Sequence, residues 1–166
     1  MKNGLTLKHR KLSASLAIGT LMGFSPATWA AESPVDFVKC SSSKATSLNV
    51  GGDVTAIGLE NTGIIASGST KDFENSSAHC VGLFRIVGGK RAGNGMCKFL
   101  DPAGNTVLGE FQILGPGEGS WEFLAGTGKF KGISGSGQWK VYTTAKPSVE
   151  GSSQFCERYT GKYTLP

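Results

Sequence analysis

The sequence predicts a single all-β domain folded as an eight-stranded antiparallel barrel. The run at 120–144, SWEFLAGTGKFKGISGSGQWKVYTT, places two aromatic strands on either side of a glycine-rich corner. Glycine costs about 1 kcal/mol in a helix interior, whereas in a sheet it permits bends and close backbone approach. About eight strand-like segments alternate with turn residues, and no stretch has a helical period. A sandwich is the alternative, but closure into a barrel removes unpaired sheet edges.

The individual strands follow from alternation of apolar and polar residues and from the turns between them. The clearest is 79–87, HCVGLFRIV, which is apolar on both faces except at Arg85. We expect the serine-rich segment 41–46 to be a link, and 61–63 and 88–95 to be turns, because these segments are rich in Ser, Gly and Asn. The other predicted strands are 35–40 with an extension at 47–50, 54–59, 64–67, 96–100, 106–114 and 154–165, together with the two strands of the central run.

Residues 1–30 have the features of a secretory signal peptide, so the predicted domain covers 31–166. A basic head precedes an apolar stretch that is too short to span a bilayer, and small residues follow at Thr28 and Ala30. We therefore expect an exported protein, periplasmic or extracellular, with cleavage after Ala30 and no membrane span afterwards.

Removal of this leader changes the charge balance. The full chain has 17 Lys and Arg against 12 Asp and Glu, a net charge of +5. The leader holds four of the basic residues and no acidic one, so the mature chain is close to neutral. The basic isoelectric point therefore gives no support for a nucleic-acid partner.

All four cysteines lie in the mature part, and an even count in an exported chain predicts disulfides. Four cysteines allow three pairings, and the sequence alone does not choose among them. We predict Cys80–Cys97, which would join the strands of one hairpin, and Cys40–Cys156, which would join the first strand to the last. A zinc site is disfavoured because no C-x-x-C pair occurs and His79 is the sole histidine of the mature chain.

The central run resembles the allene oxide cyclase-like and dirigent-like barrels. The segment 124–135, LAGTGKFKGISG, is similar to their G-T-G-x-[FY]-x-G-x-x-G signature. The upstream segment CVGLFRIVGGKRAGNGMCKFLDPAGN resembles small secreted bacterial proteins thought to share this barrel, and the likeness covers about 78–142. The resemblance implies a calycin-like barrel, often with an apolar cavity and often homo-oligomeric. It transfers no catalytic residue, because no position outside the glycine hairpin matches.

Two familiar motifs are excluded by their context. Gly126-Thr127-Gly128-Lys129 lacks the upstream glycine, the following hydroxyl residue and the helix that a phosphate-binding loop requires, and a dinucleotide site fails for the same lack of a helix. We expect no cofactor and no metal. Cys80 beside His79 is not a catalytic pair, because adjacent strand residues point to opposite faces.

The candidates for a ligand site are aromatic and charged residues on strands. Arg85 and Glu122 are the polar candidates; the alternative for each is an outward-facing side chain. Aromatic residues could line a cavity or fill the core, since eight strands enclose room for side chains or for one small ligand. The ligand-lining candidates are Phe84, Phe99, Trp121, Phe123, Phe130 and Trp139.

Three functions are compatible with these features. The first is a protein that binds a small apolar or aromatic molecule inside the barrel. The second is a cofactor-free cyclase or isomerase, which needs at least one acid or base, such as Glu122 or Arg85, inside the cavity. The third is a structural or interaction protein with a solid core. The sequence leaves open whether the protein is an enzyme.

Overall fold

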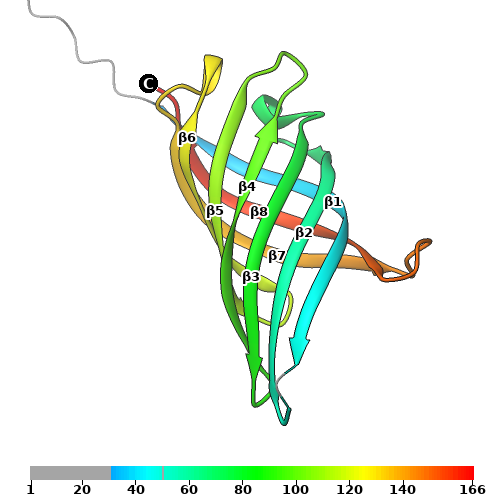
Figure 1. Cartoon of the computed structure of the whole chain (residues 1–166). Coiled ribbons are helices and arrows are strands. Elements are labelled where there is room, and N and C mark those ends of the chain that lie inside the picture. Colours follow the sequence, from blue (N-terminus) through cyan, green and yellow to red (C-terminus); the bar gives the residue numbers. More distant parts are fainter. Residues whose placement is uncertain (1–30, 50) are drawn as a thin grey trace, which may run out of the picture.

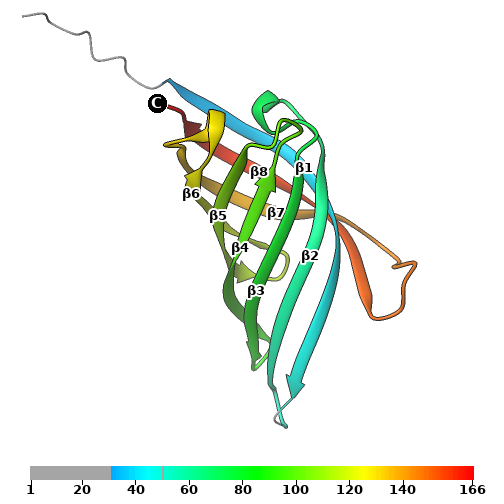
Figure 2. The same cartoon turned by 45° about the horizontal axis from the view of Figure 1, so that its top comes forward.

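The computed structural model describes residues 31–49 and 51–166 and confirms the all-β barrel. Eight antiparallel strands each pair with the next, and the first pairs with the last, which closes the barrel (Figures 1 and 2). The predicted signal peptide lies outside the described residues. The strands are β1 Glu32–Asn49, β2 Val54–Gly68, β3 Ser77–Val87, β4 Lys90–Leu100, β5 Thr106–Gly115, β6 Glu118–Gly126, β7 Ser134–Ala145 and β8 Ser152–Thr164, with short 3₁₀ helices η1 Lys71–Phe73 and η2 Gly128–Phe130.

Several strands are longer than the sequence predicted. The serine-rich 41–46 is no link but part of β1, and 61–63 is no turn but part of β2. Of the predicted turn 88–95, only Gly88 and Gly89 form the bend, both with positive φ, and β4 begins at Lys90. Backbone pairing with two neighbouring strands stabilises these weakly strand-forming residues, so tertiary context overrides their local preference.

One end of the barrel is closed by aromatic packing around η1. Phe73, on η1, is fully buried. Its ring centroid lies 5.1 Å from that of Phe130, 5.2 Å from that of Phe123 and 5.7 Å from that of Phe37. The two 3₁₀ helices lie at the same end of the barrel, at the top of Figure 1. We call this the closed end and the opposite one the open end.

Inward-facing glycines make room for the large side chains of the interior. A Cβ atom at Gly137 or at Gly161 would lie 2.7 Å from Cζ2 of Trp121. The indole of Trp121 therefore crosses strands β7 and β8, and its Nε1 donates to the backbone oxygens of Gln138 and Thr160, at 3.1 and 3.2 Å. Gly137 of the central run and Gly161 of β8 thus serve the packing of an aromatic side chain, and neither lies in a turn.

Both predicted disulfides are present, and each joins directly opposed residues of neighbouring strands. Cys80–Cys97 links β3 to β4 and is buried in the interior. Cys40–Cys156 links β1 to β8 through half-buried residues next to Lys39 and Glu157, which face inward. No helix in residues 31–49 and 51–166 has the length and hydropathy needed to cross a membrane.

Candidate functional site

The open end of the barrel holds a cavity of about 400 Å³. The cavity exists because the inward positions there are small: Ser43 and Ala45 on β1, and Gly115 and Gly117 around the β5–β6 turn. Its walls are mostly apolar, with Arg91 among the polar groups and Glu157 as its carboxylate. The larger apolar side chains that line it are Ile57, Leu59, Phe84, Ile113, Trp139, Val141 and Phe155.

A buried ion pair separates this cavity from the aromatic core. Lys39 of β1 and Glu157 of β8 approach to 2.9 Å between Nζ and Oε2, and their side chains are 1% and 10% exposed. Alternation along each strand directs them inward, since Lys39 follows Val35 and Phe37, and Glu157 lies between Phe155 and Tyr159. Removal of two charges from water is costly, so each charge requires the other.

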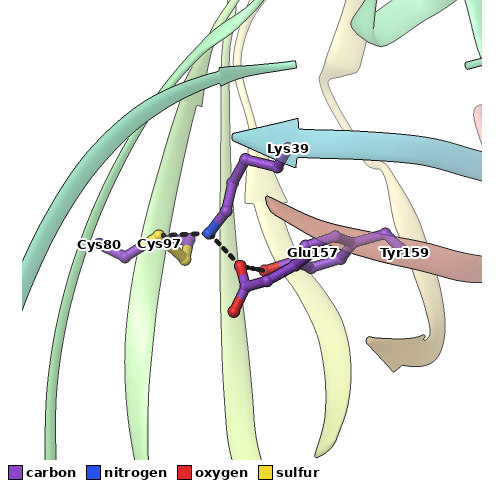
Figure 3. Close-up of a disulfide and its surroundings, with 5 residues drawn as sticks. All are labelled: Lys39, Cys80, Cys97, Glu157 and Tyr159. Carbon is purple, nitrogen blue, oxygen red and sulfur yellow. Dashed lines mark hydrogen bonds and ion pairs between the residues drawn. A yellow bond between two sulfur atoms is a disulfide. The ribbon is translucent and has the colours of Figure 1, made fainter. Parts of the chain in front are cut away.

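Further contacts hold the ion pair in place (Figure 3). The Tyr159 hydroxyl donates to Oε2 of Glu157 at 3.3 Å. The Lys39 ammonium lies 5.4 Å from the centroid of the Tyr159 ring and 3.6 Å from Sγ of Cys80, which is in the interior disulfide. Burial, and then the nearby Glu157 carboxylate, raise the pKa of Tyr159 well above its ordinary value, so this hydroxyl keeps its proton at neutral pH.

One carboxylate oxygen of Glu157 is left for other partners. In the described part of the chain, both hydrogen-bonding contacts use Oε2 and none uses Oε1. Figure 3 shows this oxygen turned away from Lys39 and Tyr159. Because Glu157 lines the cavity, this oxygen can accept a hydrogen bond from a molecule held there.

Other interior polar atoms also lack partners within residues 31–49 and 51–166. They are Oγ of Ser41, Oδ1 of Asn61, Oγ of Ser76 and Nε1 of Trp139. Unpaired buried polar atoms cost free energy, and ordered water or a ligand usually satisfies them. Trp139 is also one of the residues that line the cavity. The interior therefore combines apolar walls with a few polar groups, as small-molecule sites do.

The predicted aromatic candidates fall into two groups. Phe84 and Trp139 line the cavity. The other four are buried in the core toward the closed end: Phe99, Trp121, Phe123 and Phe130.

The two polar candidates lie on the outer surface. Arg85 and Glu122 are exposed. Glu122 faces Glu110 across the β5–β6 ladder, in a polar groove on the outside of the sheet. Neither side chain belongs to the cavity at the open end. Cys80 is in a disulfide, and His79 lies outside the barrel with its Nε2 2.8 Å from Oε1 of Glu60.

The sequence interpretation missed Lys39 and Glu157, although a signal was present. Each charged residue has the same alternation phase as the aromatic residues of its strand, in VDFVK and FCERY. A charge in phase with buried aromatics on two strands predicts an internal ion pair. In the described residues, no group of three His, Cys, Asp or Glu side chains could hold a metal ion.

The sequence matches no family model and no curated protein. Comparison of structures finds dirigent proteins. The pterocarpan synthase dirigent protein GePTS1 superposes with a TM-score of 0.50 at 13% identity, over 88% of this chain and 98% of its own. The pterocarpan synthase dirigent protein PsPTS1 gives 0.50 at 12%, over 81% and 95%. The dirigent-like barrel is thus confirmed as a fold, and a place in its secreted bacterial branch stays a prediction.

Proposed function

We propose that this protein is exported and binds a small, largely apolar or aromatic molecule in the open half of its barrel. The observation that carries the proposal is the 400 Å³ cavity, with apolar walls and the unpaired Glu157 oxygen. Such a volume suits one small molecule. The fold supports the proposal. Two proteins whose solved structures resemble this barrel are both named pterocarpan synthase dirigent proteins, and a pterocarpan is a small molecule.

Glu157 is the polar anchor in this proposal. Lys39 balances its charge, so the floor of the cavity is neutral overall and favours an uncharged donor, such as a hydroxyl group, over an ammonium. A hydrogen bond to a charged group contributes about 1.5–3 kcal/mol. A ligand with a hydroxyl at one end and an apolar body should therefore bind roughly tenfold or more tightly than its hydroxyl-free analogue.

A neutral fluorescent dye, N-phenyl-1-naphthylamine, tests whether the cavity binds ligands. We expect saturable enhancement of its emission at one dye per protein. Leu59→Trp fills the cavity and should abolish the enhancement. Leu83→Trp makes the same change on the outer face of the neighbouring strand and should leave it intact. Equal enhancement in wild type and Leu59→Trp would show that the dye binds elsewhere.

Naphthalene and 2-naphthol, as competitors of the dye, test the anchor. The wild type should prefer the naphthol by about tenfold. The double variant Lys39→Met and Glu157→Leu removes both charges together, so that neither is left buried alone. It should bind the two compounds equally. A preference that persisted in this variant would assign the discrimination to another group.

The buried carboxylate also favours a second function, cofactor-free catalysis by proton transfer. An ionised Glu157 beside a bound carbonyl compound can accept an α-proton through Oε1. Deuterium uptake by 2-tetralone in D₂O, followed by mass spectrometry, tests this activity. Catalysed uptake in the wild type that disappears in the double variant would support an enzyme. Equal deuterium uptake with the wild type and with the double variant would contradict catalysis by Glu157 and would leave ligand binding as the single proposed function.

Export is tested by the intact mass of the protein purified from its natural source. Loss of residues 1–30 gives one mass, and retention gives another. A protein that kept these residues would contradict the predicted cleavage after Ala30.

A further inference from the structure

The outer face of the barrel carries an apolar and cationic band around the open end. We call Leu48, Val54, Leu83, Arg85, Val87 and Lys90 the rim band. Its apolar members are between 39% and 68% exposed. Strand register makes the band continuous: Leu48 pairs with Ala56, Ala56 with Arg85 and Arg85 with Ala92.

A second row lies nearer the tips of the hairpins. There Val54 pairs with Val87, and Val87 with Lys90. These rows occupy the lower ends of β1 to β4 in Figure 1, which project beyond the β5–β6 turn. Contiguous exposed apolar side chains of this kind mark interaction surfaces.

The cations of this region are not balanced by acids. Within residues 31–49 and 51–166, Arg85, Lys90 and Arg91 form no ion pair. Asp53, in the β1–β2 turn, is the one acid among the described residues of the two hairpin tips. At the closed end, by contrast, Lys129 pairs with Asp101 at 3.2 Å.

This combination restricts the kind of partner. A second copy placed symmetrically on the band would bring Arg85 and Lys90 toward their own counterparts, and like charges oppose such contact. The headgroup region of an anionic bilayer accepts both components, because its phosphates attract the cations and its acyl boundary receives the apolar side chains.

We propose that the rim band docks this protein on an anionic lipid surface, with the open end of the barrel against the bilayer. The cavity opens at the same end, so an apolar molecule could pass between the bilayer and the cavity without crossing bulk water. The docking surface consists of outward-facing residues. Docking on a lipid surface is a separate function from ligand binding, and this proposal does not depend on whether the cavity holds a molecule.

Co-sedimentation with large vesicles tests the proposal. We expect binding to vesicles of phosphatidylcholine mixed with phosphatidylglycerol, and little binding to phosphatidylcholine alone. The double variant R85Q/K90Q should bind about 25-fold more weakly, because each basic residue near an anionic surface strengthens binding roughly fivefold. L83S/V87S should bind about tenfold more weakly while it keeps the charge.

The matched control is K98Q/K131Q, which removes the same charge from exposed lysines outside the rim band. It should bind within about twofold of the wild type. All variants share the same N-terminus, so the comparison isolates the band. Circular dichroism confirms that each variant is folded.

Three results would overturn the proposal. One is equal weakening in K98Q/K131Q, which would indicate adsorption through net charge. Another is equal binding to the neutral and the anionic vesicles. The third is binding to heparin, a soluble polyanion, without binding to either kind of vesicle.

Discussion

The two halves of this barrel share the same eight strands but use their interiors differently. Toward the closed end, rings such as Phe37, Phe73 and Phe123 stack and fill the space. Toward the open end, Ser43 and Ala45 leave a cavity of about 400 Å³. An eight-stranded barrel is near the size at which either outcome is possible, so the size of a few inward residues decides which half is solid.

The ion pair and both disulfides lie between these halves. Lys39 and Glu157 are next in sequence to Cys40 and Cys156, and Lys39 contacts Cys80. We therefore expect substitutions in the closed half to change mainly the free energy of unfolding, and substitutions around the cavity to change mainly ligand binding.

Removal of the Cys40–Cys156 disulfide should have the largest effect on both halves. It closes a loop of 116 residues, and the chain-entropy model gives about 5 kcal/mol for such a loop. Urea unfolding of C40A/C156A should show this loss in the free energy of unfolding. In a Trp139→Phe background, which removes the tryptophan at the cavity, emission of the buried Trp121 and release of cavity-bound dye should change together. Separate transitions would show that the halves unfold independently.

Truncation of one aromatic residue in each half should give unequal losses. Phe73→Ala leaves a large cavity in the packed core and should cost about 4 kcal/mol of unfolding free energy. Phe84→Ala, beside the existing cavity, should cost about 1 kcal/mol and weaken dye binding instead. Equal losses in urea unfolding would contradict the division into a solid half and an open half.

Breaking the boundary ion pair should be costly, whereas replacing it should not. Glu157→Gln leaves the Lys39 charge buried and unpaired, and we expect a loss of about 3 kcal/mol. Lys39→Met with Glu157→Leu should unfold within about 1 kcal/mol of the wild type, because apolar side chains pack well in place of a buried pair. If the double variant were as unstable as the single one, the pair would be a source of net stability.

Acid should weaken the contacts of Asp101, which lies in the β4–β5 turn at the closed end. The pKa of Asp101 is lowered from 3.8 to about 2. The largest cause is a hydrogen bond from the Asn105 side chain, and the Asn105 backbone N–H and Lys129 add to it, while burial acts in the opposite direction. The lowered pKa stabilises the fold above pH 3.8, and this contribution is lost as the pH falls toward about 2. Asp101→Asn should therefore lower the melting temperature at pH 7 by more than at pH 2. A constant difference across this range would exclude the carboxylate charge as the cause.

The sequence predicted the fold better than the site. Turn residues and aromatic alternation predicted the barrel. The cysteine count alone left three pairings open, and the two that are present were chosen from the expected hairpin and the expected closure of the barrel. Strand ends were missed where Ser41 or Gly63 continue a ladder, because these residues have no strand preference of their own. Alternation also tells which face a side chain is on but not its height along the barrel. For that reason Phe99 and Phe84 looked equivalent, although one lies in the core and the other at the cavity.

The charged residues show the same limit. Arg85 lies on a strand that is apolar on both faces, since the outward-facing Leu83 and Val87 belong to the rim band. The alternation of apolar and polar residues therefore could not predict whether the Arg85 side chain points into the barrel or out of it. The alternation pattern could have identified Lys39 and Glu157 as inward-facing residues. It could not have predicted that they pair with each other, because that depends on the β1–β8 register, which brings together residues distant in sequence.

Pairing of the first strand with the last also determines when this molecule can finish folding. Glu32 pairs with Thr164, and Lys44 with Ser152, so the seam forms only when almost the whole chain is present. The local hairpins can assemble early, whereas the entropic penalty of the long loop delays the seam. Until it forms, two bare strand edges are available to other chains. We therefore expect dilution and early oxidation to raise refolding yield more than any improvement of the core.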